Sequence, residues 1–416
     1  MDICRNYKES GIFWQPSVPE EWVVTRLKHV LLKLSRERNP EDELLVCSNS
    51  GDVKKRGDSK LGLVAESNDI YQGVKAGDLL IHGMDTWHGA IAVSEYDGMC
   101  TPVVHVCDST QNKKYVALYL RNMASLKIFK LISNGVRQNT SDFRSWDKLA
   151  NIPIPLPPLA EQEKIVSYLE DKTSKIDAYV ADKEKEIELL QELKQKTIAD
   201  AVTKGLNPDA KMKDSGISWI GEIPEHWETR RAKFMFIKNK RERRPEDEVI
   251  TCFRDGQVTL RKNRRLTGFT ESEKYDGYQG IRKGDLVIHQ MDAFAGSIGV
   301  SDSDGMGTSV YHCCTPTGDY NVYYYAYLIR QMALSGFIQS LYKGIRERSS
   351  DFSFPVFGNQ FLLIPPKDEQ QSIVAYIEEK CEKIDKLASE LQSEIDYLKE
   401  YKQRLIADCV TGQVKV

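Results

Sequence analysis

The chain repeats its own sequence. The phrase YQGVKAGDLLIHGMD at residues 71–85 returns as YQGIRKGDLVIHQMD at residues 278–292. Three further blocks recur in the same order, namely SGIFWQPSVPEEW and SGISWIGEIPEHW (10–22 and 215–227), RERNPEDELLVC and RERRPEDEVITC (36–47 and 241–252), and LPPLAEQEKIVSYLEDKTSKID and IPPKDEQQSIVAYIEEKCEKID (156–177 and 364–385). Solenoid repeats recur every 20 to 50 residues or so, and this period is far longer. It indicates a duplicated domain, and we expect two similar modules related by an internal pseudo-twofold.

The bulk composition is that of an ordinary globular protein. A chain of 416 residues with 41% hydrophobic content has material for two or three domains with normal cores. No apolar stretch approaches the roughly 20 residues that a bilayer crossing needs, and the N-terminal MDICRNYKESG lacks the apolar core of a signal peptide. The sequence therefore predicts a cytoplasmic protein with no membrane partner. The nine cysteines show no paired Cys-x-x-Cys spacing, which predicts reduced thiols.

Charge is segregated along the chain. A net charge of -3 argues against a simple basic DNA-binding domain. Basic residues nevertheless gather in the module regions, at residues 230–244, at residues 261–265 and, more thinly, at residues 54–56. A charge run is usually a solvated face, but its recurrence at equivalent places in both modules makes nucleic-acid binding an equally good interpretation.

Two long helices are predicted after the proline pairs Pro157-Pro158 and Pro365-Pro366, because proline interrupts regular structure before a new helix begins. Apolar residues then recur at alternating spacings of three and four, the heptad pattern of a coiled coil. The predicted interface residues are Val166, Leu169, Ile176, Ile187 and Leu190 in the first helix and Val374, Ile377, Ile384, Ile395 and Leu398 in the second. About 40 helical residues at 1.5 Å each give a rod roughly 60 Å long. Since neither stripe is covered alone, we expect an antiparallel two-helix coiled coil; packing of each helix on its own module is the alternative.

The module regions mix short strands and helices. Gly-Asp and Asp-Gly turns bound apolar runs, and residues 79–82 and 286–289 are typical of buried strands. Residues 114–132 and 321–341 carry apolar side chains at helical spacing. The predicted fold class is therefore α+β, with two modules of mixed sheet plus helices separated by the coiled coil. The predicted boundaries are a lead-in at 1–22, a first module at 23–155, a first spacer helix at 156–205, a linker with the repeated lead-in at 206–227, a second module at 228–363 and a second spacer helix at 364–416.

No catalytic centre is predicted. The chain lacks a Walker A motif, a G-x-G-x-x-G loop and a D/N-P-P-Y/F methylation motif. His105 near Cys107, and His312 beside Cys313, lie on predicted strands without a second ligand pair, so we expect no metal. His82 with Asp85, and His289 with Asp292, resemble a nuclease dyad, but a packing or backbone-contact role in both modules fits better.

Side chains suited to reading DNA stand out instead. Arginine forks onto guanine, and asparagine or glutamine onto adenine. The candidates are Asn49, Lys54, Lys55, Arg56, His82, Arg137, Gln138 and Asn139 in the first module, and Arg254, Gln257, Arg261, Lys262, Arg264, His289, Arg346 and Arg348 in the second. For each of them, an ordinary solvated side chain is the alternative.

The sequence resembles the specificity subunits of type I restriction-modification systems over nearly its whole length. The resemblance rests on the repeated phrase, on the W-x-x-x-x-P-x-x-W openings at residues 14–22 and 219–227, and on the P-P-x-x-E-Q-x-x-I-V motifs at residues 157–166 and 365–374. It implies two target recognition domains that each read one half of a split DNA site, with the helices as spacer. It also implies no catalysis by this chain and no cofactor bound to it. Two modification subunits would methylate adenine with S-adenosylmethionine, and restriction subunits would use ATP and Mg. Much of the phosphate contact would come from these partners, which suits the modest net charge.

Three other interpretations stay open at the level of sequence. The chain is compatible with a stand-alone DNA endonuclease or methyltransferase that has an unrecognised centre. A second alternative is a structural coiled-coil scaffold, which leaves the basic loops of both modules unexplained. The third is the specificity subunit of a related system in which nuclease and methyltransferase share one polypeptide.

Overall fold

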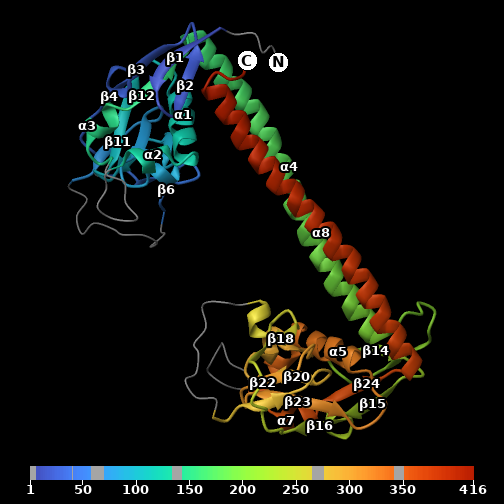
Figure 1. Ribbon diagram of the computed structural model, residues 1–416. Coiled ribbons are helices and arrows are strands. Elements are labelled where there is room, and N and C mark those ends of the chain that lie inside the picture. The colour runs from blue at the N-terminus through green and yellow to red at the C-terminus, as the bar shows by residue number, and fades with distance from the viewer. Residues whose placement is uncertain (1–5, 40, 58–69, 134–142, 265–275, 342–350) are drawn as a thin grey trace. The chain divides into compact units, whose positions relative to one another are not determined.

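The computed structural model describes residues 6–39, 41–57, 70–133, 143–264, 276–341 and 351–416 (Figure 1). The chain divides into two compact units. Unit 1 consists of Met1–Glu184 with Gln392–Val416, and unit 2 of Lys185–Leu391. Each unit therefore holds one module, the near end of one long helix and the far end of the other.

The first module is built on a four-stranded antiparallel sheet in the order β4-β11-β8-β9, formed by Leu31–Lys33, Val104–Ser109, Leu79–His82 and Ile91–Val93. Side chains alternate between the faces of a strand. In β8, Leu79 and Ile81 accordingly join the core beneath helix α1 (Lys113–Ser125). Leu80 joins a second, smaller core on the opposite face with Leu45. Burial on both faces explains why this strand is a continuous apolar run.

Short strand pairs and helices complete the first module. The pairs are β1 with β2 (Tyr7–Ile12, Gln15–Pro19), β3 with β12 (Val23–Arg26, Pro153–Leu156), β5 with β6 (Leu45–Cys47, Val53–Lys55) and β7 with β10 (Gln72–Val74, Gly98–Cys100). The short helices are η1 (Leu27–His29), η2 (Thr86–His88), α2 (Ile128–Ile132) and α3 (Trp146–Ala150). The mixed sheet and helix content confirms the predicted α+β class at this level.

Unit 2 repeats the same plan. Its sheet has the order β16-β23-β20-β21, formed by Phe236–Asn239, Tyr311–Pro316, Leu286–His289 and Ile298–Val300. Its strand pairs are β13 with β14 (Met212–Asp214, Glu222–Pro224), β15 with β24 (Glu228–Arg231, Phe361–Ile364), β17 with β18 (Ile250–Cys252, Val258–Leu260) and β19 with β22 (Gln279–Ile281, Gly305–Gly307). Its short helices are η3 (Ala232–Phe234), η4 (Arg261–Asn263), η5 (Ala293–Ala295), α5 (Val322–Leu334), α6 (Phe337–Ser340) and α7 (Phe354–Gly358). The two modules thus share one strand order.

The helices expected over residues 114–132 and 321–341 are each broken once. Lys127, at φ 58°, separates α1 from α2, and Gly336, at φ 80°, separates α5 from α6. Both backbones are in the left-handed region, which ends a helix. The helical spacing over residues 114–132 and 321–341 is therefore confirmed, and each range holds two helices.

The two long helices are α4 (Leu159–Lys204) and α8 (Lys367–Val410). In unit 1, Lys402 pairs with Asp177 at 2.6 Å and Lys399 with Glu184 at 2.9 Å. Residues later in α4 therefore face residues earlier in α8. This order is that of antiparallel helices. In unit 2, Lys194 pairs with Asp385 at 2.6 Å. All ten predicted interface residues are buried or half-buried.

The ends of the helices pack on the modules as well as on each other. In unit 1, Leu169 of α4 and Val410 of α8 belong to the core of the first module. In unit 2, Ile377 of α8 and Val202 of α4 belong to the core of the second. The alternative interpretation, in which the helices pack on the modules, therefore holds for the helix ends.

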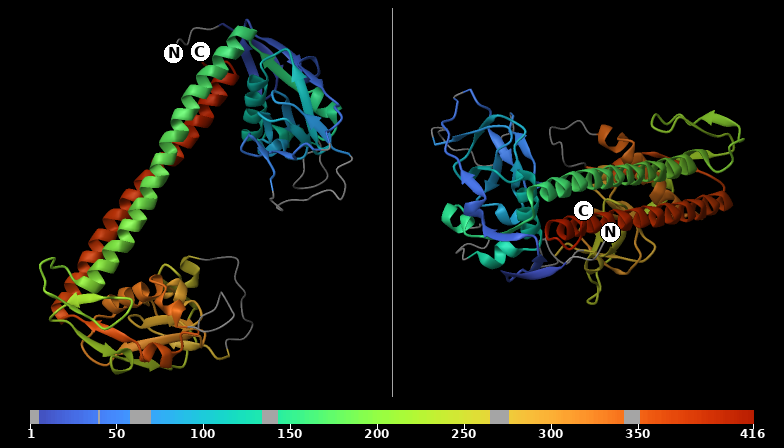
Figure 2. Two further views of the ribbon diagram at one scale, coloured as in Figure 1. Left: turned by 180° about the vertical axis from the view of Figure 1, so that it is seen from behind. Right: turned by 90° about the horizontal axis from the view of Figure 1, so that it is seen from above.

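Each module also receives the far end of the other repeat's helix. Tyr115 Oη donates to the carbonyl of Val410 at 3.1 Å, and Tyr324 Oη donates to that of Val202 at 2.8 Å. The β1–β2 pair lies beside the end of α8, where Tyr7 Oη donates to Gly412 O at 3.0 Å (Figure 2). None of the helices in the described part of the chain has the length and apolar content that a membrane crossing requires.

Candidate nucleic-acid interface

Many of the candidate DNA-reading residues lie on one hairpin in each module. Lys54 and Lys55 lie on β6, Arg56 follows it, and Asn49 lies in the turn between β5 and β6. In the second module, Arg254 and Gln257 lie in the turn between β17 and β18, and Arg261, Lys262 and Arg264 follow β18. Five candidates thus lie on equivalent hairpins, which we call the reader hairpins (residues 45–55 and 250–260), and four more directly follow them.

Both reader hairpins have the same turn. In the first, Ser48 N donates to Asp52 O at 2.9 Å; in the second, Phe253 N donates to Gln257 O at 2.8 Å. A glycine with positive φ stands at the same place in each, Gly51 at 82° and Gly256 at 91°. The modules therefore present one backbone shape with different side chains.

Cations on the reader hairpins, and in the segment that follows the second hairpin, form surface ion pairs. Lys54 pairs with Asp52 at 3.0 Å, and Lys55 with Glu43 at 2.5 Å. The second module has Arg254–Asp292 at 3.0 Å, Lys262–Glu248 at 2.5 Å and Arg264–Asp255 at 2.6 Å. Exposed pairs of this kind contribute little, about 0 to 1 kcal/mol, so a DNA phosphate can compete for the cation. The ion pairs thus orient the cations and still allow them to exchange a carboxylate for a phosphate.

His82 and His289 stabilise a turn. The Nδ1 atom of each ring accepts the backbone N–H three residues later, from Asp85 at 3.1 Å and from Asp292 at 3.0 Å. Burial lowers the pKa of both imidazoles, which favours the neutral ring that accepts this bond. This geometry matches the backbone-contact interpretation, while DNA contact by either ring stays a prediction.

Arg137, Gln138, Asn139, Arg346 and Arg348 lie outside the described residues. The chain that follows each of these segments is anchored by a buried histidine. His105 Nε2 donates to Phe143 O at 2.7 Å, and His312 Nε2 donates to Phe352 O at 3.0 Å. Both Nε2 atoms are therefore already engaged. Within the described residues, no three His, Cys, Asp or Glu side chains are grouped to hold a metal ion.

The chain is similar in sequence to proteins of type I restriction systems. Residues 88–189 match the family model for the type I restriction modification DNA specificity domain. The putative type I restriction enzyme MjaX specificity subunit of Methanocaldococcus jannaschii is 30% identical over 245 residues, which are 54% of this chain and 54% of that protein. The MjaVIII specificity subunit of the same organism is 40% identical over 83 residues, covering 20% of this chain and 18% of that subunit. The chain is thus similar to specificity subunits of type I restriction enzymes over about half of its length, and residues 88–189 match their DNA specificity domain.

Solved structures share its fold. A chain from a type I restriction-modification system, solved to explain complex assembly and conformational transition, aligns at a TM-score of 0.68 with 18% identity, covering 95% of this chain and 99% of that one. The HsdS subunit from Thermoanaerobacter tengcongensis aligns at 0.52 with 17% identity, covering 95% and 98%. The alignment to the MjaX relative spans about half of that relative's length.

The candidate interface includes two arginines that the sequence did not single out. Arg121 of α1 and Arg330 of α5 each donate a hydrogen bond to a carbonyl of a reader-hairpin turn. The signal for them was present, because ALYLRNM and AYLIRQM place an arginine at the same point of both helices.

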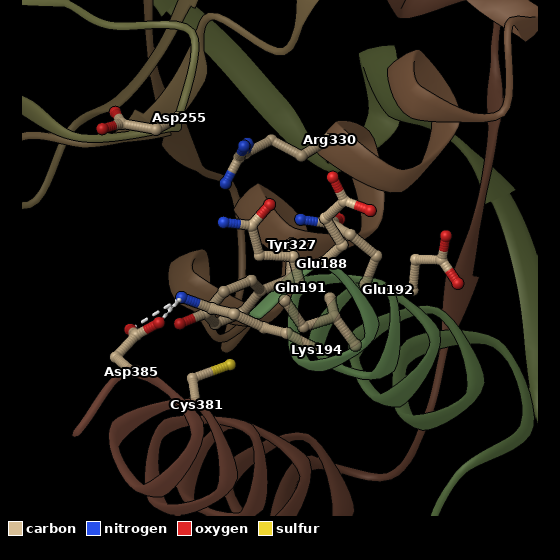
Figure 3. Close-up of a pocket in the computed structure, with 11 residues that line it drawn as sticks. Glu188, Gln191, Glu192, Lys194, Asp255, Tyr327, Arg330, Cys381 and Asp385 are labelled. Carbon is tan, nitrogen blue, oxygen red and sulfur yellow. Dashed lines mark hydrogen bonds and ion pairs between the residues drawn. The ribbon is translucent and has the colours of Figure 1, made fainter. Parts of the chain in front are cut away.

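An open cleft of about 1000 Å³ lies in unit 2 between α4, α8 and the turn of the second reader hairpin (Figure 3). Glu188, Glu192 and Asp255 line it, together with Arg330 and the Lys194–Asp385 pair. Carboxylates outnumber cations on this lining. The cleft therefore disfavours DNA phosphates, unlike the flanks of the hairpin.

Proposed function

We propose that the chain is the DNA sequence-specificity subunit of a type I restriction-modification complex, in which each module reads one half of a bipartite double-stranded target. The supporting observation is that both modules carry the same reader hairpin on the same scaffold, with different side chains at equivalent places. A duplicated fold presents equivalent elements to the two halves of a site. Different tips, such as Asn49 against Arg254, then select different bases.

The two long helices set the gap between the half-sites in this proposal, within an internal pseudo-twofold. The pairs Lys194–Asp385 and Lys402–Asp177 occupy equivalent positions of the repeat, which supports one defined helix register. One added heptad lengthens a helix by about 10 Å, or roughly three base pairs. Insertion of one heptad into both helices is expected to widen the gap by that amount and to leave both half-sites unchanged.

Partner subunits supply the chemistry in this proposal. Leu189 and Leu193 of α4 are 54% and 51% exposed, and Tyr397 and Tyr401, at the equivalent positions of α8, are 71% and 47% exposed. Residues four apart share one helix face, and apolar side chains exposed on a charged helix are typical of an interface. Two modification subunits, one for each patch, would bind S-adenosylmethionine and methylate adenine. Restriction subunits would bind ATP and Mg, this chain would hold no cofactor, and the complex would act in the cytoplasm.

Mapping of N6-methyladenine in the host genome, with and without this gene, tests the proposal. The expected result is one interrupted motif that loses all methylation when the gene is deleted. Methylation that persists at every motif contradicts it. Activity of the purified chain alone, given S-adenosylmethionine, ATP and Mg, would instead favour a stand-alone enzyme.

A further inference from the structure

Arg121 and Arg330 reach from a module helix to the turn of its reader hairpin. Arg121 Nη2 donates to Ser50 O at 2.5 Å, and Arg330 Nη2 donates to Arg254 O at 3.2 Å. The accepting carbonyls differ by one position in the turn. The same contact thus exists in both modules although the hairpin sequences differ.

The turn glycine packs directly against each guanidinium. A Cβ on Gly51 would overlap Arg121, and a Cβ on Gly256 would collide with Arg330. Positive φ alone already favours glycine at both places. The close approach adds a second requirement, since only a bare backbone leaves room for the arginine.

The arginine also ties the hairpin to the turn that ends the repeated phrase. Arg330 Nε donates to Gly296 O at 3.2 Å, at the end of η5. A Cβ on Gly296 would lie 2.9 Å from Arg254 O, and one on Gly89 would lie 3.6 Å from Asn49 O. Helix, phrase turn and hairpin tip therefore meet at one place in each module.

Each arginine is charged, which strengthens its hydrogen bonds to the turn carbonyls. Both side chains are half-buried, and burial lowers the pKa of both guanidinium groups, which remain protonated because their ordinary value is 12.5. Asp52 and Asp255 favour the charged form from the hairpin side. A planar fork of five donors fixes several acceptors at once, which a lysine does not.

We propose that Arg121 and Arg330 are positioning residues, each of which sets the pose of its own module's reader hairpin and thereby the base discrimination at one half-site. This inference rests on the proposed function. A two-stranded hairpin is marginal by itself. The smaller core of each module holds the hairpin strands, through Leu45, Cys47 and Val53 or through Ile250, Cys252 and Val258. The turns at 48–52 and 253–257 contribute no residue to these cores, so the pose of the tip depends on the arginine. Base-edge hydrogen bonds tolerate errors of only about 0.5 Å.

The test uses the full chain assembled with its modification subunits. Arg121→Met and Arg330→Met keep the apolar stem and remove the fork, while Arg404→Met (82% exposed) and Lys386→Met (78% exposed) are matched controls. Methylation is measured on the mapped target and on two duplexes that each carry substitutions in one half. Each arginine variant is expected to lose about tenfold of its discrimination at one half-site only, the two variants affecting opposite halves. On the intact target, KM rises and kcat is unchanged.

Wild-type discrimination at both halves in either folded variant overturns the inference, and so does an equal loss at both halves, which a merely structural role would give. If a methionine variant does not fold, Gly51→Ala and Gly256→Ala displace the guanidinium instead and carry the same expectation. A separate experiment, exchange of the whole second module, detects failure of the proposed function itself. Exchange of the whole second module would then leave both halves of the methylated motif unchanged.

Discussion

The indole Nε1 of Trp22 donates a hydrogen bond to Oε2 of Glu161 at 3.2 Å, and Trp227 makes the same bond to Glu369 at 3.0 Å. Both tryptophans are fully buried. Each tryptophan closes its half's opening motif, and each glutamate belongs to the motif at the start of a long helix. In each half, the tryptophan motif and the proline–glutamate motif are far apart in sequence and are joined by this hydrogen bond. We call this contact the joint between the lead-in segment and the long helix.

Removal of the acceptor should weaken this joint. Glu161→Ala leaves the buried Trp22 N–H without its partner, which costs about 1 to 3 kcal/mol of unfolding free energy. Glu161→Gln keeps an acceptor oxygen and should cost less. Urea unfolding followed by tryptophan fluorescence measures both, with Glu163→Ala at an exposed position of the same helix as control. Equal stability of Glu161→Ala and Glu163→Ala would refute the role given to the bond.

The Lys194–Asp385 pair should behave as a coupled unit. Lys194 is 28% exposed and Asp385 is 61% exposed, so solvent weakens the attraction. Lys194→Asp should destabilise the helix pair, and Asp385→Lys in the same chain should restore it, with a coupling energy of about 0.5 to 1 kcal/mol. A double-mutant cycle at 0.05 M and 1 M salt measures this coupling, which should shrink at high salt. The equivalent pair Lys402–Asp177 is the internal comparison, and additive single effects would count against coupling.

The buried His312 should make stability depend on pH. Burial, and then the Lys238 charge, lower the pKa of its imidazole from 6.5 to about 4. The unfolded chain binds the proton more readily, so this stability is fully present above pH 6.5 and is lost as pH falls toward 4. His312→Gln should therefore reduce the loss of unfolding free energy between pH 7.5 and pH 5 by about 2 kcal/mol. His29→Gln, at an exposed position, should leave the loss unchanged, and an unaltered pH profile in His312→Gln would exclude this histidine as the cause.

The exposed helix patches should each hold one modification subunit. Leu189→Ser with Leu193→Ser, and Tyr397→Ser with Tyr401→Ser, should each weaken one docking event about tenfold or more. Native mass spectrometry at limiting concentration should show a complex short of one modification subunit in either case. Lys185→Ser, an exposed charge on the same helix, is the control. Two subunits bound as tightly as in the wild type would remove these patches from the interface.

Features that depend on local periodicity were predictable from the sequence. The apolar run at 79–82 is strand β8, and the heptad pattern after Pro158 is α4, which starts at Leu159. Features that depend on the meeting of distant side chains were not. Gln162, for example, is fully buried and accepts the backbone N–H of Asn112 at 3.0 Å, which fixes the helix start to the module. No spacing rule connects those two positions.

The break in the helical stretch of each module is marked by a glycine in the second copy of the repeat and not in the first. Gly336 marked the break between α5 and α6, because glycine tolerates positive φ. Its equivalent is Lys127, a residue that normally continues a helix and yet adopts φ 58°. Comparison of the two repeats would have revealed the break, whereas the first copy alone favours a continuous helix.

The composite make-up of unit 1 also bears on how the protein folds during synthesis. Its core includes Leu405 and Val410, which the ribosome makes only after the whole of Lys185–Leu391. At about 5 to 20 residues per second, this intervening stretch takes roughly 10 to 40 s to translate. Throughout that time the first module lacks the helix end that shares its core and accepts the bond from Tyr115. The module made first is thus completed last, and until then its incomplete core leaves apolar side chains open to aggregation and to chaperones.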